Sequence, residues 1–195
     1  GSGNLTFGGF KQNEELWISF TSQDGETGPI AAFREFLLVC VERVPMSQGA
    51  RHEIDEAFDA TTHTWAREMS IPDGLVWRIG EGPSLLDRMA SIVGDRVVDR
   101  LCVCSPYYDG DGVGLKGLTE LWPQAATELL VQSGQSTLTQ PAIDATGIKL
   151  CLLSIMSRPK NSGNTFIHAK FYAMFCGSEV LVFVGSANCS AAALT

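Results

Sequence analysis

Apolar residues follow two different spacings along this chain, and together they predict a mixture of helices and strands. Helical spacing, with Pro or Gly beside each segment, predicts helices over residues 30–43, 48–69, 84–94 and about 115–122. Short apolar or alternating runs predict strands at 14–20, 75–78, 98–105, 127–132, 148–156, 166–175 and 179–185. The polar stretch at 133–146 is predicted to be a loop.

Helices alternate with buried strands in this pattern, and that order favours an α/β fold. The Gly-rich segment at 109–114 links the strand at 98–105 to the next helix. It lacks both the GK[ST] ending of a P-loop and GxGxxG spacing, and Val113 stands at the third acidic position of a calcium loop. We therefore predict a plain strand-to-helix connection here.

Composition adds limits to the function. The chain has 195 residues, of which 45% are hydrophobic, and a net charge of −8. This charge disfavours a broad electrostatic grip on nucleic acid, although a local basic cleft stays open. No run of 18 apolar residues and no signal-peptide pattern occurs, so a cytoplasmic location is expected. The six cysteines form no CxxC pair and lie mostly in apolar runs, which predicts reduced, buried thiols and no metal site.

The residues that best indicate chemistry lie in the last two predicted strands. His168 and Lys170 are two residues apart in the strand at 166–175, so both side chains are expected on one face. Ser186 and Asn188 follow the next strand, and a hairpin would bring them beside His168 and Lys170. Ser190 is the predicted N-cap of a short helix whose backbone N–H groups would favour a phosphate.

These residue types suit a phosphodiester. A His side chain can act as a nucleophile or as a general acid and base near neutral pH. A Lys ammonium neutralises phosphoryl oxygens, and an Asn amide adds neutral donors where charge develops. A site built in this way needs no metal ion and no cofactor.

The pattern HxK followed by GSxN resembles the signature of the phospholipase D superfamily. The resemblance implies an α-β-α sandwich with a mixed sheet, in which two such motifs pair within one chain or across a homodimer. One His attacks phosphorus and the other protonates the leaving group. The usual Asp, five residues after the Lys, would fall at Phe175. In lacking this Asp the chain is similar to tyrosyl-DNA phosphodiesterases and other nuclease-like members.

The resemblance also gives a meaning to the first residues. Ser2 and Asn4 repeat the spacing of Ser186 and Asn188, and Glu15 stands thirteen positions after Ser2. In the family an acidic residue at this offset orients a catalytic His. Ser2 and Asn4 are therefore expected to bind phosphate, as are Lys170 and Asn188. A flexible Gly-rich terminus is the alternative interpretation.

The spacing between motifs suggests how the chain is divided. The His that matches Ser2 would precede Gly1, which predicts a fragment with an incomplete first half. Residues 1–20 would end the first phospholipase D-like half, 21–83 would connect the halves, and 84–195 would form a truncated second half. The missing motif would lie in the same parent chain, or two copies would pair as a homodimer, and an isolated fragment would be inactive or nearly so.

Three functions remain open. The first is a phosphodiesterase that forms a phosphohistidine intermediate and acts on nucleic acid or a nucleic-acid adduct. His168, Lys170, Ser186, Asn188 and Glu15 would be its catalytic residues. The second is a phospholipase D or phospholipid synthase, which would need an apolar groove or a membrane-binding helix. The third is a degenerate, non-catalytic binding or scaffold protein, which the Phe175 departure and the acidic composition allow.

Overall fold

The computed structural model describes residues 28–60, 82–132, 134–148, 151–152 and 166–195. The predicted strands at 14–20 and 75–78 lie outside these ranges, as do parts of the segments predicted at 48–69 and 148–156. The chain divides into two compact units. Residues Ser84–Thr195 belong to one unit, and Ser19–Pro83 form the other.

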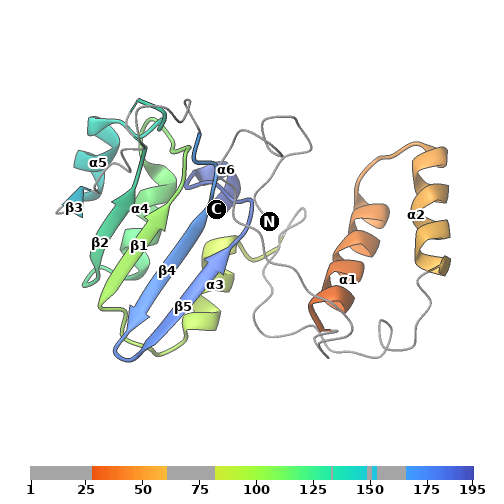
Figure 1. Ribbon diagram of the computed structural model, residues 1–195, viewed down its shortest axis with the longest axis horizontal. Helices are drawn as coiled ribbons and strands as arrows, with labels where there is room; N and C mark the ends of the chain where they lie inside the picture. The colour runs from red at the N-terminus through yellow and green to blue at the C-terminus, as the bar shows by residue number, and fades with distance from the viewer. Residues whose placement is uncertain (1–27, 61–81, 133, 149–150, 153–165) are drawn as a thin grey trace, which may run out of the picture. The chain divides into compact units, whose positions relative to one another are not determined.

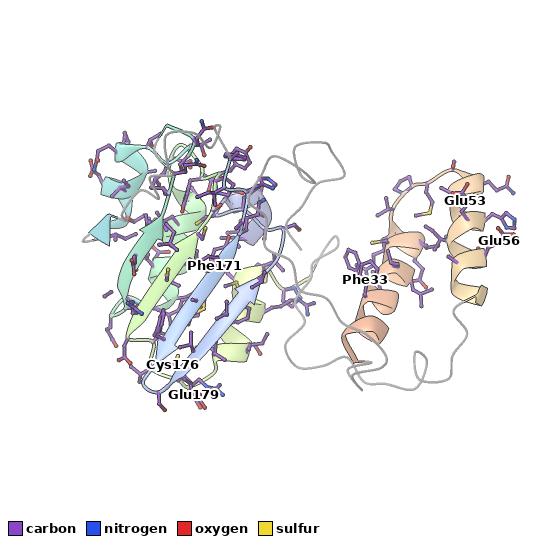
Figure 2. The ribbon with its side chains drawn as sticks, viewed as in Figure 1. Phe33, Glu53, Glu56, Phe171, Cys176 and Glu179 are labelled. Carbon is purple, nitrogen blue, oxygen red and sulfur yellow. The ribbon has the colours of Figure 1, made fainter. Side chains whose placement is uncertain are left out.

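The smaller unit contains two helices, α1 (Gly28–Arg43) and α2 (Gln48–Ala60), where helices were predicted. Arg51 on α2 donates from its guanidinium to the carbonyl oxygen of Val41 at 2.7 Å, which ties the two helices together. Glu53 and Glu56 project from α2, and Phe33 projects from α1 (Figure 2). No helix among the described residues is long and apolar enough to cross a membrane.

The larger unit is built on a mixed sheet, as the α/β prediction requires (Figure 1). The strand order is β3-β2-β1-β4-β5. Strand β1 pairs in parallel with β2 and antiparallel with β4, and β4 and β5 form an antiparallel hairpin. The strands are β1 (Arg100–Cys104), β2 (Ala126–Leu130), β3 (Cys151–Leu152), β4 (Phe171–Cys176) and β5 (Glu179–Val184).

Two helices of this unit begin and end close to where the sequence indicated. Helix α3 (Leu85–Val93) starts at a capping box, in which the Ser84 hydroxyl accepts from the Asp87 N–H at 3.0 Å while the Asp87 carboxylate accepts from the Ser84 N–H at 2.9 Å. It ends at Gly94, as predicted. Helix α4 (Val113–Leu121) begins directly after Gly112, so the Gly-rich segment is the strand-to-helix connection that we expected.

One helix was missed. The stretch at 133–146 was predicted to be a loop, but it contains α5 (Gln140–Thr146). Its polar composition hid the local signals. The Thr139 hydroxyl caps its first turn by accepting from the Ala142 N–H, Pro141 lies in that first turn, and Gly147 ends the helix at a φ of 67°.

A single core joins three helices to one face of the sheet. Side chains alternate along a strand, so Leu101 and Val103 of β1 face this core while Cys102 and Cys104 face the other way. Helix α6 (Ala191–Leu194) closes the core through Leu194. The core residues are Leu86, Met89, Val93, Val98, Leu101, Val103, Tyr108, Leu115, Leu118, Leu129, Tyr172, Met174, Cys189 and Leu194. A second helical layer on the opposite face, as an α-β-α sandwich requires, stays a prediction.

Candidate functional site

His168 and Lys170 lie just before β4, not within a strand as predicted. Their neighbours explain the difference. Strand β1 ends at Cys104, which pairs with Phe171, and Val184 at the end of β5 pairs with the same residue. Residues before Phe171 therefore run past the ends of both flanking strands, where side-chain directions are no longer set by the pleat of a sheet.

The two side chains nevertheless meet, and both are buried. His168 is 6% exposed and Lys170 is 2% exposed. The Lys170 ammonium lies 3.1 Å from Nδ1 and 2.9 Å from Nε2 of the imidazole, and it donates to the His168 carbonyl oxygen at 2.9 Å. Because the ammonium lies at nearly the same distance from both ring nitrogens, the contact does not select one tautomer of the imidazole. The arrangement places the Lys170 ammonium directly against the His168 imidazole.

Two aromatic rings, which sequence reasoning missed, surround the imidazole. Phe166 lies 5.6 Å from the His168 ring, and Tyr107 meets it edge-on at 6.1 Å between centroids. Tyr107 and Phe166 also contact each other at 6.0 Å. Phe166 precedes His168 by two residues, but Tyr107 comes from the loop after β1. Both rings restrict the orientation of the imidazole.

Ser186 and Asn188 follow β5, and the hairpin brings their segment next to Lys170 as predicted. The Gly185 N–H donates to the Lys170 carbonyl oxygen at 3.4 Å. Ser186 is exposed. The Asn188 side-chain oxygen is buried and accepts no hydrogen bond from the described residues. Within the described parts of the chain, no hydrogen bond joins either side chain to His168 or Lys170, so only the backbone proximity is established.

The predicted capping at Ser190 is half right. Ser190 is the N-cap residue of α6, but its side chain makes no capping hydrogen bond. The Ala191 N–H instead donates to the carboxylate of Asp109 at 2.7 Å. This N–H is therefore already bonded and is not the phosphate donor that we expected.

Phe175, where the resemblance would place an acidic residue, lies at the opposite end of β4 from Phe171. Phe171 and Cys176 mark the two ends of β4, and Glu179 lies beside Cys176 at the hairpin (Figure 2). Phe175 lies four residue steps along β4 from Phe171, which corresponds to about 13 Å. There the Arg100 guanidinium stacks on the Phe175 ring at 3.8 Å from its centroid. An acidic residue at position 175 would therefore not lie next to His168.

The cysteines next to the site are protonated at neutral pH. Burial raises the pKa of the Cys104 thiol to about 11, with Cys102 adding to the rise and Lys170 opposing it. Cys40, Cys102, Cys104, Cys176 and Cys189 form no disulfide, and Cys40 and Cys176 are only partly buried. The described residues hold no group of three or more His, Cys, Asp or Glu side chains placed to bind a metal ion.

The first-half residues Ser2, Asn4 and Glu15 lie outside the described residues. Comparisons with protein-family models, with curated proteins and with solved structures give no match to this chain.

Proposed function

We propose that this protein cleaves phosphodiesters through a covalent phosphohistidine formed at His168, within a phospholipase D-like fold. The observation that carries the proposal is the buried contact between the Lys170 ammonium and the His168 imidazole. Burying an ionised side chain costs on the order of several kcal/mol of folding free energy unless hydrogen bonds or charges compensate it. Such costs are typical of sites where the charge is used on a ligand.

The chemistry follows from the residue types. In the first step an imidazole nitrogen of His168 forms a bond to phosphorus, and the bond from phosphorus to the leaving oxygen breaks. The leaving oxygen takes a proton from a general acid, which the resemblance assigns to the His of a second motif. In the second step water attacks phosphorus, the P–N bond breaks, and the water gives its proton to that same second His.

Lys170 and Asn188 have supporting roles. The ammonium of Lys170 leaves the ring nitrogen when a phosphoryl oxygen arrives, because an oxyanion is the stronger acceptor. Asn188 supplies neutral N–H donors to another phosphoryl oxygen, and the exposed Ser186 hydroxyl lies two residues away. Ser2, Asn4 and Glu15 would complete the site from the first half, as the repeat in spacing predicts.

Kinetics of two histidine variants test the proposal. His168→Ala in the full-length protein is expected to lower kcat/KM for bis(4-nitrophenyl) phosphate by at least about 10²–10⁴-fold, the usual contribution of a His that transfers protons or attacks the substrate. The matched control is His52→Ala, because His52 is 72% exposed on α2 and pairs only with the neighbouring Glu56 in the described structure. Undiminished turnover by His168→Ala refutes the assignment.

The substrate class is tested by offering competing phosphodiesters side by side. We expect a single-stranded oligonucleotide or its 3′-phosphodiester adduct to be cleaved faster than phosphatidylcholine in vesicles, because the chain shares its missing Asp with nuclease-like members. Faster release of choline would favour the phospholipase alternative. Cleavage of neither, with the full-length protein folded, would favour a non-catalytic binding protein.

A further inference from the structure

The backbone that follows Asn188 is held by a loop from a distant part of the chain. Strand β1 leads into residues 105–109, and this loop makes three contacts with residues 189–191. Cys189 donates its N–H to the Ser105 hydroxyl at 3.1 Å and forms an isolated β-bridge with Tyr108. Ala191 donates its N–H to the Asp109 carboxylate at 2.7 Å. The contacts span more than eighty residues of sequence.

Ser105 is fixed by a complete set of hydrogen bonds. It is 2% exposed, and its hydroxyl donates to the Tyr107 carbonyl oxygen at 2.9 Å. The same oxygen accepts from the N–H groups of Tyr107 and Cys189. A Ser hydroxyl offers one donor and two acceptor lone pairs, so all three are in use. The hydroxyl therefore sets the position of the Cys189 backbone relative to β1.

Asp109 joins the beginnings of two helices through one oxygen. Its Oδ2 accepts from the Gly114 N–H on α4 at 2.8 Å and from the Ala191 N–H on α6 at 2.7 Å. Charge-assisted hydrogen bonds of this kind are short and roughly twice as strong as neutral ones. Since the Ser190 side chain makes no cap bond, Asp109 supplies the capping that α6 would otherwise lack.

The position of Asn188 depends on the hydrogen bonds that Ser105 and Asp109 make to the two residues around Ser190. Strand β5 ends at Val184, and Asn188 belongs to neither a strand nor a helix. Its buried side-chain oxygen has no hydrogen-bond partner within the described structure, while its backbone carbonyl oxygen accepts from the Ser190 N–H at 2.9 Å. The direction of the side chain is then set by the backbone on either side. Tyr172 holds that backbone before Asn188, through a hydrogen bond from its hydroxyl to the Ala187 carbonyl oxygen at 3.0 Å.

We infer that Ser105 and Asp109 are positioning residues for phosphodiester cleavage, and that they act by fixing where Asn188 places its amide against the phosphoryl group. The inference rests on the function proposed above. Neither residue touches the substrate. Their contribution is geometric, because a misplacement of about 1 Å in a group that stabilises the transition state can cost roughly a hundredfold in rate.

Four variants of the full-length protein test this role. Asp109→Asn keeps an oxygen that can accept from both Gly114 and Ala191, whereas Asp109→Ala removes it. We expect Asp109→Ala to lower kcat by about a hundredfold with a much smaller change in KM, and Asp109→Asn to restore kcat to within about threefold of wild type. Ser105→Ala is expected to lower kcat by about tenfold, because Asp109 still holds Ala191. The matched control is Asp111→Ala, an exposed carboxylate of the same loop, with unchanged kinetics expected.

A second measurement separates positioning from folding. Inorganic tungstate, which mimics phosphate, is added to ¹⁵N-labelled protein, and the side-chain amide signal of Asn188 is followed by NMR. We expect the signal to shift in wild type and in Asp109→Asn, and to shift by less than half as much in Asp109→Ala at saturating tungstate. If Asp109→Ala does not fold, the same NMR titration is made with Ser105→Ala, and a reduced shift of the Asn188 amide signal is expected there.

Two outcomes overturn the inference. One is a wild-type kcat and a wild-type Asn188 shift in Asp109→Ala. The other is equal damage by Asp109→Asn and Asp109→Ala, which would mean that the charge of Asp109 acts and not its two hydrogen bonds. Failure of the proposed function is a different outcome, because it would appear as retained turnover in His168→Ala. An inactive His168→Ala together with a fully active Asp109→Ala would refute the positioning role alone.

Discussion

Replacing Gly114 by Ala tests how closely α4 packs against the turn that follows Asn188. Gly114 is buried, and a Cβ at this position would lie 2.5 Å from the backbone carbonyl carbon of Ser190 and 2.7 Å from its Cα. Ordinary contact begins at 3.4 Å, so the difference from 2.5 Å requires α4 and Ser190 to separate by about 0.9 Å. Both obstructing atoms are backbone, which cannot rotate away as a side chain does.

The separation has two expected consequences. Overpacking of this kind typically costs about 1–3 kcal/mol of stability, and we expect the free energy of unfolding to fall by that amount. Ser190 lies two residues after Asn188, so the shift also moves the proposed phosphate-binding amide. A displacement near 1 Å predicts a kcat about a hundredfold lower in the molecules that remain folded.

Urea unfolding and turnover of bis(4-nitrophenyl) phosphate by the full-length protein measure the two effects. Gly110→Ala is the matched control, since a Cβ at Gly110 of the same loop would meet no atom within 4 Å. We expect Gly110→Ala to match wild type in both assays. Equal stability and equal turnover of Gly114→Ala and Gly110→Ala would show that the close approach of α4 to Ser190 is not as described.

Three further predictions concern the surroundings of the site. Tyr172→Phe removes the hydrogen bond to the Ala187 carbonyl oxygen and should lower the free energy of unfolding by about 1 kcal/mol in urea, and no change would contradict the bond. Raising the pH from 9.0 to 11 should lower stability, because burial raises the pKa of Cys104 from 9.0 to about 11 and the unfolded chain loses the thiol proton first. This thiol contributes at most about 1.4 kcal/mol per pH unit to the slope of the unfolding free energy against pH. Cys104→Ala should remove that contribution, and an unaltered slope would refute the prediction. Ser84→Ala should lower the melting temperature, because it removes about 1 kcal/mol of stabilisation at the capping box with Asp87. Ser84→Thr keeps a hydroxyl cap and should keep the wild-type melting temperature. Equal melting temperatures of the two variants would argue against the cap.

Local signals in the sequence were sufficient for most element positions. The Ser84 and Gly94 boundaries of α3 are encoded within a few residues of each helix end, and the β4–β5 hairpin follows from two adjacent apolar runs. The start of β4 at Phe171 was not predictable in this way. It depends on where β1 ends, and β1 is far away in the sequence.

The candidate site shows the same division. The spacing of His168 and Lys170 pointed to a shared site, and their side chains do meet. Tyr107 and Asp109 were missed because their partners lie sixty to eighty residues away, and a single sequence carries no periodicity for such contacts. Ser190 is the N-cap residue of α6 as predicted, but its side chain makes no capping hydrogen bond for the same reason. The Asp109 carboxylate, which comes from a distant part of the chain, accepts the hydrogen bond from the Ala191 N–H. The local capping rule had predicted a bond to the Ser190 hydroxyl instead.

The central claim is a covalent bond between His168 and phosphorus, and mass spectrometry tests it most directly. Full-length protein is mixed with bis(4-nitrophenyl) phosphate, quenched in alkali, in which a phosphohistidine survives, and digested with trypsin. Cleavage after Lys160 and Lys170 releases residues 161–170, whose single His is His168. The account predicts a nitrophenylphosphoryl adduct on this peptide that is lost in acid and absent from His168→Ala. Turnover with the adduct on another residue of this chain, or with an adduct that persists in His168→Ala, would contradict it.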